Sequence, residues 1–313
     1  MDNKGGMGMS KIRSLLVGAA LIIATATSAS ATSLLKLGEN DLFFNNFENL
    51  YDANGNYVDA ATQFTRGILV GDYLMGILSV QNIDQAGTTH FYQGPTEQLS
   101  GIFLQQVTGI TPEGFANNLP LYHIDFGTAA RTTFTNQDGS TTDISGLLNA
   151  NEMMALYYQN GPTTTVFESN GTINDDVAKA TDGSKWMGLG LSPTQGMGAG
   201  YFYSHVNIYT PLNNFDGNAW AALNVMTNNT GFVFGGVNDP NEQEKGGSTL
   251  LTELYMSSEL EWNPGNANGT SPWTYRSNDP AHVEPVPEPS TIILLGAGLV
   301  GLIACRRKMI NKD

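Results

Sequence analysis

The chain has 313 residues, of which 41% are hydrophobic, 14% are charged and 36 are glycine. The apolar content is sufficient for a folded core, and the abundance of glycine argues against a helical bundle or a coiled coil. The formal net charge of −15 argues against nucleic acid as a partner, because binding to phosphates requires a basic surface. A single cysteine rules out an intramolecular disulfide framework.

The first apolar segment, Leu15–Ala26, follows two basic residues and precedes the triplet Ala29-Ser30-Ala31. A basic start, a short apolar run and an A-x-A site are typical of a secretory signal peptide. We therefore predict that residues 1–31 are a signal peptide and that signal peptidase cleaves after Ala31. The alternative is a buried N-terminal helix.

The body that follows, residues 32–262, is predicted to be mainly β. Strands are indicated by runs that alternate between apolar and polar residues, or that are apolar on both faces. Two β-branched runs on either side of Asp138-Gly139 predict a hairpin. We expect these strands to form an antiparallel β-sandwich or a jelly-roll-like core. The predicted strands cover residues 65–83, 99–110, 131–135, 140–144, 201–209 and 250–262.

One short helix is predicted in the body, at Ala150–Gln159. Asn149 can cap it, Glu152 stands three residues further on as in a capping box, and the sequence Asn-Gly-Pro follows the helix. The polar stretch 168–185 is predicted to be a long loop and the best position for an internal domain boundary. The segment 263–285 is rich in Pro, Asn and Gly and is predicted to be a linker.

Oxygen-bearing side chains alternate at Asp52, Asn54 and Asn56, as they do in Ca²⁺-binding loops. The pattern lacks the glycine of the sixth position, and Gln63 stands where such loops have a glutamate. A Gly-Asn turn between two strands is the alternative. Ca²⁺ is therefore the one cofactor for which the sequence offers candidate ligands, and no other cofactor is predicted.

The sequence lacks the local motifs of common catalytic sites. It contains no G-x-S-x-G nucleophile elbow, and its four histidines form neither H-x-H nor H-E-x-x-H. We therefore predict a protein without enzymatic activity and assign no catalytic residue. Aromatic rings can stack on sugar rings instead, with core packing as the alternative role. The candidate rings are those of Trp186, Trp220, Trp262 and Trp273.

The second apolar segment, Thr291–Cys305, has no charged residue and is followed by Arg306, Arg307 and Lys308. As a helix it would be about 22 Å long, which is shorter than the hydrocarbon core of about 30 Å. We predict a C-terminal hydrophobic helix that inserts into the inner membrane transiently, with its basic end in the cytoplasm.

A proline-containing stretch precedes this apolar segment, and its prolines favour an extended, accessible backbone. The stretch consists of Val286, Pro287, Glu288, Pro289 and Ser290. With the apolar segment and the basic end, it resembles the PEP-CTERM sorting signal of Gram-negative bacteria, over residues 286–313. The resemblance implies recognition by an exosortase-type membrane protease, removal of the tail, and a final position at the cell surface or outside the cell. It also implies a context of exopolysaccharide, biofilm and floc formation.

We therefore expect an exported protein of the cell surface or extracellular matrix, with a structural or adhesive role in contact with exopolysaccharide. One alternative is a secreted hydrolase of polysaccharides, whose carboxylates the fold would bring together. Another alternative is a passive surface protein that Ca²⁺ stabilises.

Overall fold

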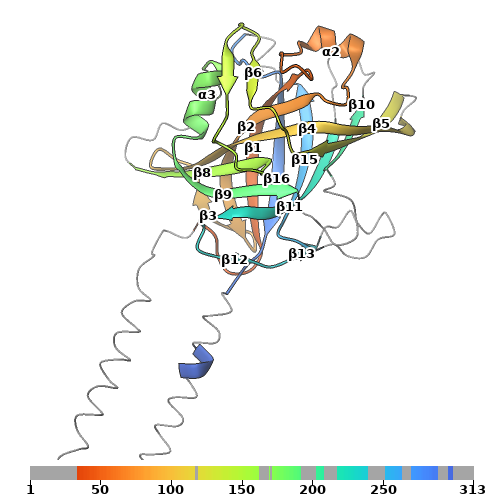
Figure 1. The fold of residues 1–313 in the computed structure, drawn as a ribbon. Helices are drawn as coiled ribbons and strands as arrows, with labels where there is room; N and C mark the ends of the chain where they lie inside the picture. The colour runs from red at the N-terminus through yellow and green to blue at the C-terminus, as the bar shows by residue number, and fades with distance from the viewer. Residues whose placement is uncertain are drawn as a thin grey trace, which may run out of the picture. The chain divides into compact units, whose positions relative to one another are not determined.

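The computed structural model describes residues 34–116, 119–161, 169, 171–191, 202–207, 217–238, 251–262, 269–287 and 295–298. Its named elements are antiparallel strands and two short helices (Figure 1). They are β1 (Asn40–Tyr51), α2 (Ala60–Arg66), β2 (Tyr73–Gln85), β3 (Thr88–Tyr92), β4 (Glu97–Ala116), β5 (Leu119–Gly127), β6 (Thr133–Thr135), β7 (Thr141–Asp143), β8 (Met154–Asn160), α3 (Ile173–Ala180), β9 (Ser184–Leu191), β10 (Phe202–Asn207), β11 (Gly217–Asn228), β12 (Val233–Phe234), β13 (Val237–Asn238), β14 (Leu251–Thr252), β15 (Leu254–Trp262), β16 (Tyr275–Val283) and β17 (Pro285–Val286).

The largest sheet closes on itself and forms a barrel of eight strand positions. β8 pairs with the first half of β4 and β5 pairs with the second half, so β5 and β8 together occupy one position. β9 and β10 share β11 in the same way. The order around the barrel is β1, β2, β4, β5 with β8, β9 with β10, β11, β15 and β16, and β16 pairs back with β1. Because this order follows the chain, the barrel is of the up-and-down type.

The predicted mainly β, antiparallel character is confirmed, but the predicted sandwich or jelly roll is wrong. Alternating strands look alike in both architectures, because each strand has one face on a core. The difference lies in the closing pair, where Asn40 of β1 stands opposite Val283 of β16 and Glu48 stands opposite Tyr275. No local pattern in the sequence predicts a pairing between the two ends of the body.

One face of β1, β2, β4, β5, β8, β9, β11, β15 and β16 contributes to the main hydrophobic cluster, which fills the barrel. On β1 and on β2 up to Val80 the inward residues are even-numbered, as at Leu42 and Leu78, and on β4 they are odd-numbered, as at Leu99. These three side chains are fully buried. The two-residue period of a strand therefore explains which residues form the core.

Toward the C-terminal end of β1, the inward row becomes polar. Asn46 and Glu48 continue the row of β1, Gln105 continues the row of β4, and Ser277 stands opposite Asn46 on β16. All four residues are buried. The side-chain carbonyl oxygen of Gln105 has no hydrogen-bond partner within the part of the chain that the structure describes. The four residues therefore form a buried polar group between apolar residues of the same rows, such as Leu50 and Val107.

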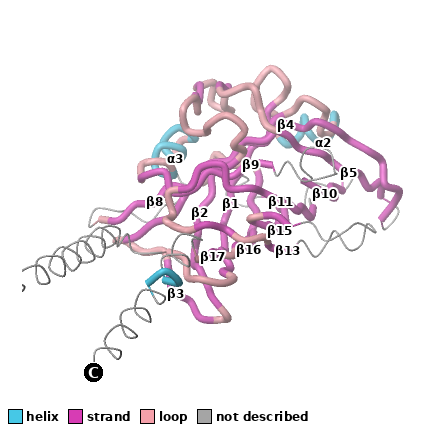
Figure 2. Tube along the Cα trace, turned by 60° about the horizontal axis from the view of Figure 1, so that its bottom comes forward, coloured by secondary structure: helices cyan, strands magenta, loops and turns pink. Residues whose placement is uncertain are grey.

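A second hydrophobic cluster lies on the outer face of β2, β4 and β8. Its strand residues, such as Ile77, Ile102 and Ala155, alternate with those that point into the barrel. The cluster is covered by α3, the β6–β7 hairpin and Trp273, and Figure 2 shows α3 next to β8. Three neighbouring strands are thus buried on both faces, which explains their continuous apolar sequence.

The predicted helix at Ala150–Gln159 is wrong, because Met154–Asn160 forms the strand β8. The interaction expected at its start does form, since the backbone N–H of Asn149 donates to the Glu152 carboxylate at 2.7 Å. It stabilises a turn and not a helix, because β8 pairs with β4 on one side and β9 on the other. Tertiary pairing here outweighs a local helix signal.

The predicted loop at 168–185 is also wrong, because this stretch contains α3 and the start of β9, whereas the internal domain boundary expected there stays a prediction. The first half of the predicted strand 65–83 likewise contains the end of α2, and β2 begins only at Tyr73. The strands predicted at 99–110, 201–209 and 250–262 and the hairpin around Asp138 are confirmed by β4, β10, β15 and β6–β7.

The segment 263–285 was predicted to be a linker, but it contains β16, which closes the barrel. Pro280 lies within this strand, and proline cannot donate to a sheet ladder. The pairing of β16 with β15 is interrupted beside it, between the pairs Ala281–Met256 and Asn278–Glu259. The barrel thus accommodates Pro280 in a strand, although the proline content of this segment favoured a linker.

The signal peptide, the residues Ala29 and Ala31, and most of the predicted C-terminal helix lie outside the described residues. Residues 295–298 are described as helical and exposed. Among the residues described, none of the helices combines the length and the apolar composition that a membrane span requires.

Candidate functional site

Three segments that are distant in sequence surround a cleft of about 380 Å³. Residues 136–138 form the turn of the β6–β7 hairpin, residues 171–173 lead into α3, and residues 269–272 precede β16. Figure 1 shows α3 and β6 next to each other. Loops that converge on a rigid scaffold are a common location for binding sites.

Hydrogen bonds of the Asn136 side chain hold the hairpin turn in place. Its side-chain oxygen accepts a hydrogen bond from the Tyr51 hydroxyl at 3.0 Å, and its amide nitrogen donates to Ser140 and Thr142 at 3.0 and 2.7 Å. The carboxylate of Asp138 accepts from the backbone N–H of Ser140 at 2.9 Å. The turn therefore presents its outer residues to solvent from a fixed backbone.

The start of α3 is fixed by a capping box. The Thr172 hydroxyl accepts from the backbone N–H of Asp175, and the Asp175 carboxylate accepts from the backbone N–H of Thr172. This motif is visible in the sequence as Thr-x-x-Asp, but it lies in the stretch that its polarity indicated as a loop. The helix start was therefore detectable from local sequence and was missed.

Asp176 joins two of the three segments behind the wall of the cleft. Its carboxylate is fully buried and accepts from the backbone N–H of Gly171 at 3.0 Å and from the indole N–H of Trp273 at 2.8 Å. Burial raises the pKa of Asp176, against the lowering effect of these hydrogen bonds. Both carboxylate oxygens are thus occupied by the protein, so the role of Asp176 is to position the walls.

The surface of the cleft offers hydrogen-bonding groups and little positive charge. Most of its residues are Asn, Gln, Asp, Thr, Ser or Gly, and Ile173 and Pro272 are the apolar exceptions. None of the described lining residues is basic. Amide, hydroxyl and carboxylate groups match the hydroxyls of a neutral ligand, whereas an anionic ligand would need a cation.

Two of the tryptophans predicted to stack on sugar lie in the core. Trp273 is 0% exposed behind the cleft, and Trp186 is 7% exposed in the cluster inside the barrel. Core packing, the alternative role, is therefore what the structure shows for these two rings, because so large an apolar area is most stable when buried. The side chains of Trp220 and Trp262 lie outside the described part.

The predicted Ca²⁺ ligands form a compact turn between Tyr51 and Tyr57. The Asp52 carboxylate accepts from the backbone N–H groups of Asn54 and Asn56, both at 2.8 Å. Burial acts to raise the pKa of Asp52, but these hydrogen bonds outweigh it and the pKa is lowered. The chain turns at Gly55 and Asn56 between β1 and α2, and Ca²⁺ binding by this loop stays a prediction.

The predicted sorting residues begin at the end of the barrel. Val286 lies in β17, which pairs with β12, and the exposed Pro287 follows it. The extended backbone predicted for this stretch is confirmed at Val286, which lies in β17. Glu288, Pro289 and Ser290 and the basic residues Arg306, Arg307 and Lys308 lie outside the described residues.

Comparison with known proteins bears on this C-terminal region. Residues 285–308 match the PEP-CTERM protein-sorting motif. No curated protein and no solved structure matches the chain. The match supports an exported protein that is sorted by an exosortase-type membrane protease to the cell surface. The C-terminal segment of this chain is a PEP-CTERM protein-sorting motif.

Proposed function

We propose that the exported barrel is a binding protein of the cell surface or matrix, without enzymatic activity, whose cleft binds a neutral stretch of exopolysaccharide. The observation that carries the proposal is the convergence of three polar, non-basic segments on one cleft with fixed walls. Its volume of about 380 Å³ is near the lower end of small-ligand sites, about 300–1,000 Å³. A short stretch of a saccharide chain suits this size.

Binding is favoured over hydrolysis by the carboxylates around the cleft. Cleavage of a glycosidic bond requires two carboxyl groups that face the substrate from opposite sides. Asp138 is the one carboxylate among the described lining residues. Asp176 lies behind the wall with both oxygens engaged. The described cleft therefore has groups that hold a sugar but lacks the pair that would cleave it.

Gln137 provides a test, because its side chain is exposed on the turn that lines the cleft. The purified exported protein is titrated with exopolysaccharide from the cells that produce it. Gln137→Ala removes an amide that can contact the sugar, and the loss of one neutral hydrogen bond of about 0.5–1.5 kcal/mol weakens binding by about 2- to 13-fold.

Asn54→Ala is the matched control, since it removes an exposed amide from a turn outside the cleft. We expect it to leave binding unchanged. Equal effects of the two substitutions would show that the cleft is not the binding site. If the unaltered protein does not bind the exopolysaccharide, the proposed binding function is refuted. Release of sugar during the titration would instead favour the alternative, a polysaccharide hydrolase.

A further inference from the structure

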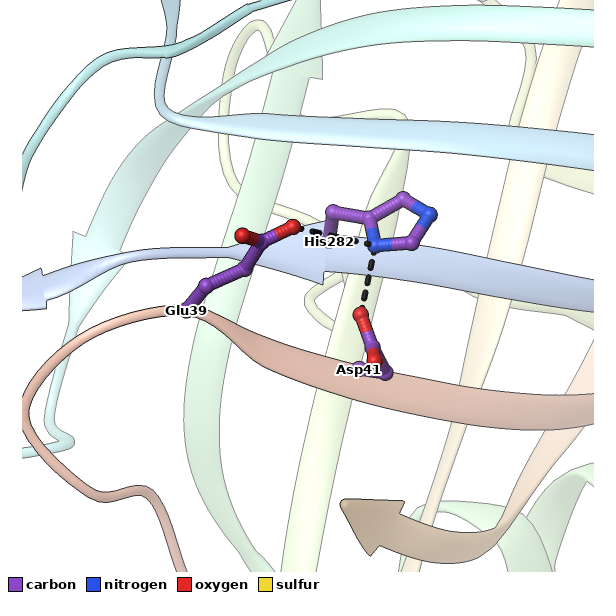
Figure 3. Close-up of side chains that lie close together, drawn as sticks. All are labelled: Glu39, Asp41 and His282. Carbon is purple, nitrogen blue, oxygen red and sulfur yellow. Dashed lines mark hydrogen bonds and ion pairs between the residues drawn. The ribbon is translucent and has the colours of Figure 1, made fainter. Parts of the chain in front are cut away.

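Three side chains that can bind a metal ion meet where the barrel closes (Figure 3). Asp41 stands directly opposite His282 in the pairing of β1 with β16, and Glu39 immediately precedes β1. The imidazole Nδ1 of His282 lies 2.6 Å from Oδ1 of Asp41 and 3.8 Å from Oε1 of Glu39. In Figure 3 both carboxylates point toward this nitrogen.

A proton on Nδ1 can form a hydrogen bond with only one of the two carboxylates. It can be donated to Asp41 at 2.6 Å, whereas the 3.8 Å to Glu39 exceeds hydrogen-bonding range. A cation at the centre of the three ligand atoms would be coordinated by both carboxylates and by the imidazole at once. The three atoms lie within 4.8 Å of one another.

The geometry is close to that of a bound transition metal. With metal–ligand distances of about 2.1 Å, tetrahedral ligand atoms are about 3.4 Å apart. The distance from Nδ1 to Asp41 would have to lengthen from 2.6 Å and the distance to Glu39 shorten from 3.8 Å. Side-chain rotation provides changes of this size, because Glu39 is 68% exposed and the other two side chains are each 32% exposed.

Neighbouring groups hold the imidazole of His282 and the backbone at Glu39 before any ion binds. The ring of Tyr255 is stacked against the imidazole of His282, with centroids 6.1 Å apart and planes at 13°. The backbone on either side of Glu39 is held by the Asn40 side chain, which donates to Lys36 and Gly38. Groups that orient the ligands in this way strengthen metal binding.

We propose that Glu39, Asp41 and His282 form a binding site for a divalent transition metal, of which Zn²⁺ is the best match. An imidazole with two carboxylates suits zinc, whereas Ca²⁺ prefers oxygen ligands alone. Three protein ligands leave a fourth position for water. The ion ties the first strand of the barrel to the last, immediately before the sorting motif.

The test is a calorimetric titration of the purified exported protein with ZnCl₂ in 150 mM salt, which screens non-specific attraction to the acidic surface. We expect one ion per chain. At a hundredfold excess of free Zn²⁺ over Kd, linkage raises Tm by about 5–10 °C. Glu39→Gln and His282→Gln should each weaken binding at least tenfold, and the exposed position of Glu39 makes its variant safe for folding.

His123→Gln is the matched control, because His123 forms a similar pair with Asp125 at 2.9 Å outside the proposed site. It should leave the titration unchanged. The proposal is overturned if the protein binds no Zn²⁺, or if Glu39→Gln and His282→Gln bind as tightly as the unaltered chain. It is also overturned if Ca²⁺ at equal concentration displaces the zinc, because an imidazole site would not favour calcium.

Discussion

Removal of the Asp176 carboxylate should loosen the cleft and destabilise the second hydrophobic cluster, on the outer face of β2, β4 and β8. In Asp176→Ala, the N–H groups of Gly171 and Trp273 lose an acceptor that is fully buried. A buried donor left without a partner costs about 1–3 kcal/mol, so the two together predict a loss of about 2–6 kcal/mol in the free energy of unfolding. Asp176→Asn keeps one acceptor oxygen and turns an amide toward the other donor, which predicts about half that loss.

Thermal and urea unfolding followed by circular dichroism measure these losses. The neighbouring Asp175→Asn is the control, because it weakens the capping box but leaves the buried carboxylate in place. A capping interaction contributes typically about 1 kcal/mol. The reasoning is refuted if Asp176→Asn is no less stable than Asp175→Asn, or if Asp176→Ala retains full affinity for polysaccharide despite the loss of its wall contacts.

Four further predictions concern buried groups and the two ends of the chain. Glu152→Gln should lower the free energy of unfolding by about 3 kcal/mol, as measured by urea unfolding, because the fully buried Glu152 carboxylate pairs with Lys185 at 2.6 Å. Burial acts to raise the pKa of Glu152, but hydrogen bonds from Lys185, Thr227 and the Asn149 backbone N–H outweigh it and the pKa is lowered. The folded state thus holds this proton less tightly than the unfolded chain, so its stabilisation is complete above the ordinary value of 4.5 and is lost as pH falls through the folded pKa. The contribution of Asp176 has the opposite pH dependence, since its raised pKa makes its stabilisation fall as pH rises above 3.8. Urea unfolding of the unaltered protein and of both variants is therefore measured against pH. The stability difference between the unaltered protein and Glu152→Gln should grow as pH rises through the acid range, whereas the difference for Asp176→Asn should shrink, and parallel differences would contradict this. Gly101→Ala should destabilise the barrel by about 1–3 kcal/mol, because an added Cβ would lie 2.2 Å from the backbone oxygen of Ala155, and an unchanged melting temperature would contradict this packing. The intact mass of the native protein should correspond to a start at Thr32 and an end between Pro287 and Ser290, whereas a mass that includes residues 291–313 would mean that the tail is retained.

Local sequence predicts the strands of the barrel better than their arrangement. Alternation places Leu254 and Met256 on one face of β15, and both are buried. The same alternation does not predict whether a sheet closes into a barrel, because closure depends on the pairing of β1 with β16. β8 was missed for a related reason, since Glu152 gives a real capping signal that the pairing of Met154–Asn160 on both sides outweighs.

The candidate sites depend on contacts between residues that are far apart in the sequence. Asp176 and Trp273 meet over a separation of 97 residues, and Asp41 and His282 over 241. No spacing rule connects such pairs, whereas the C-terminal sorting motif is contiguous and was therefore recognisable from the sequence. The polarity of the turns that form the cleft is visible in the local sequence. Their convergence depends on how α3 and the β6–β7 hairpin pack on the outer face of β2, β4 and β8.

Hydrogen exchange of the exported protein, with and without its own exopolysaccharide, tests the proposed function most directly. If the cleft binds the polysaccharide, backbone amides in residues 136–139, 171–173 and 269–273 become protected on binding, and Gln137→Ala reduces that protection. Protection confined to other strands, or none at saturating polysaccharide, would contradict the assignment of this cleft as the binding site.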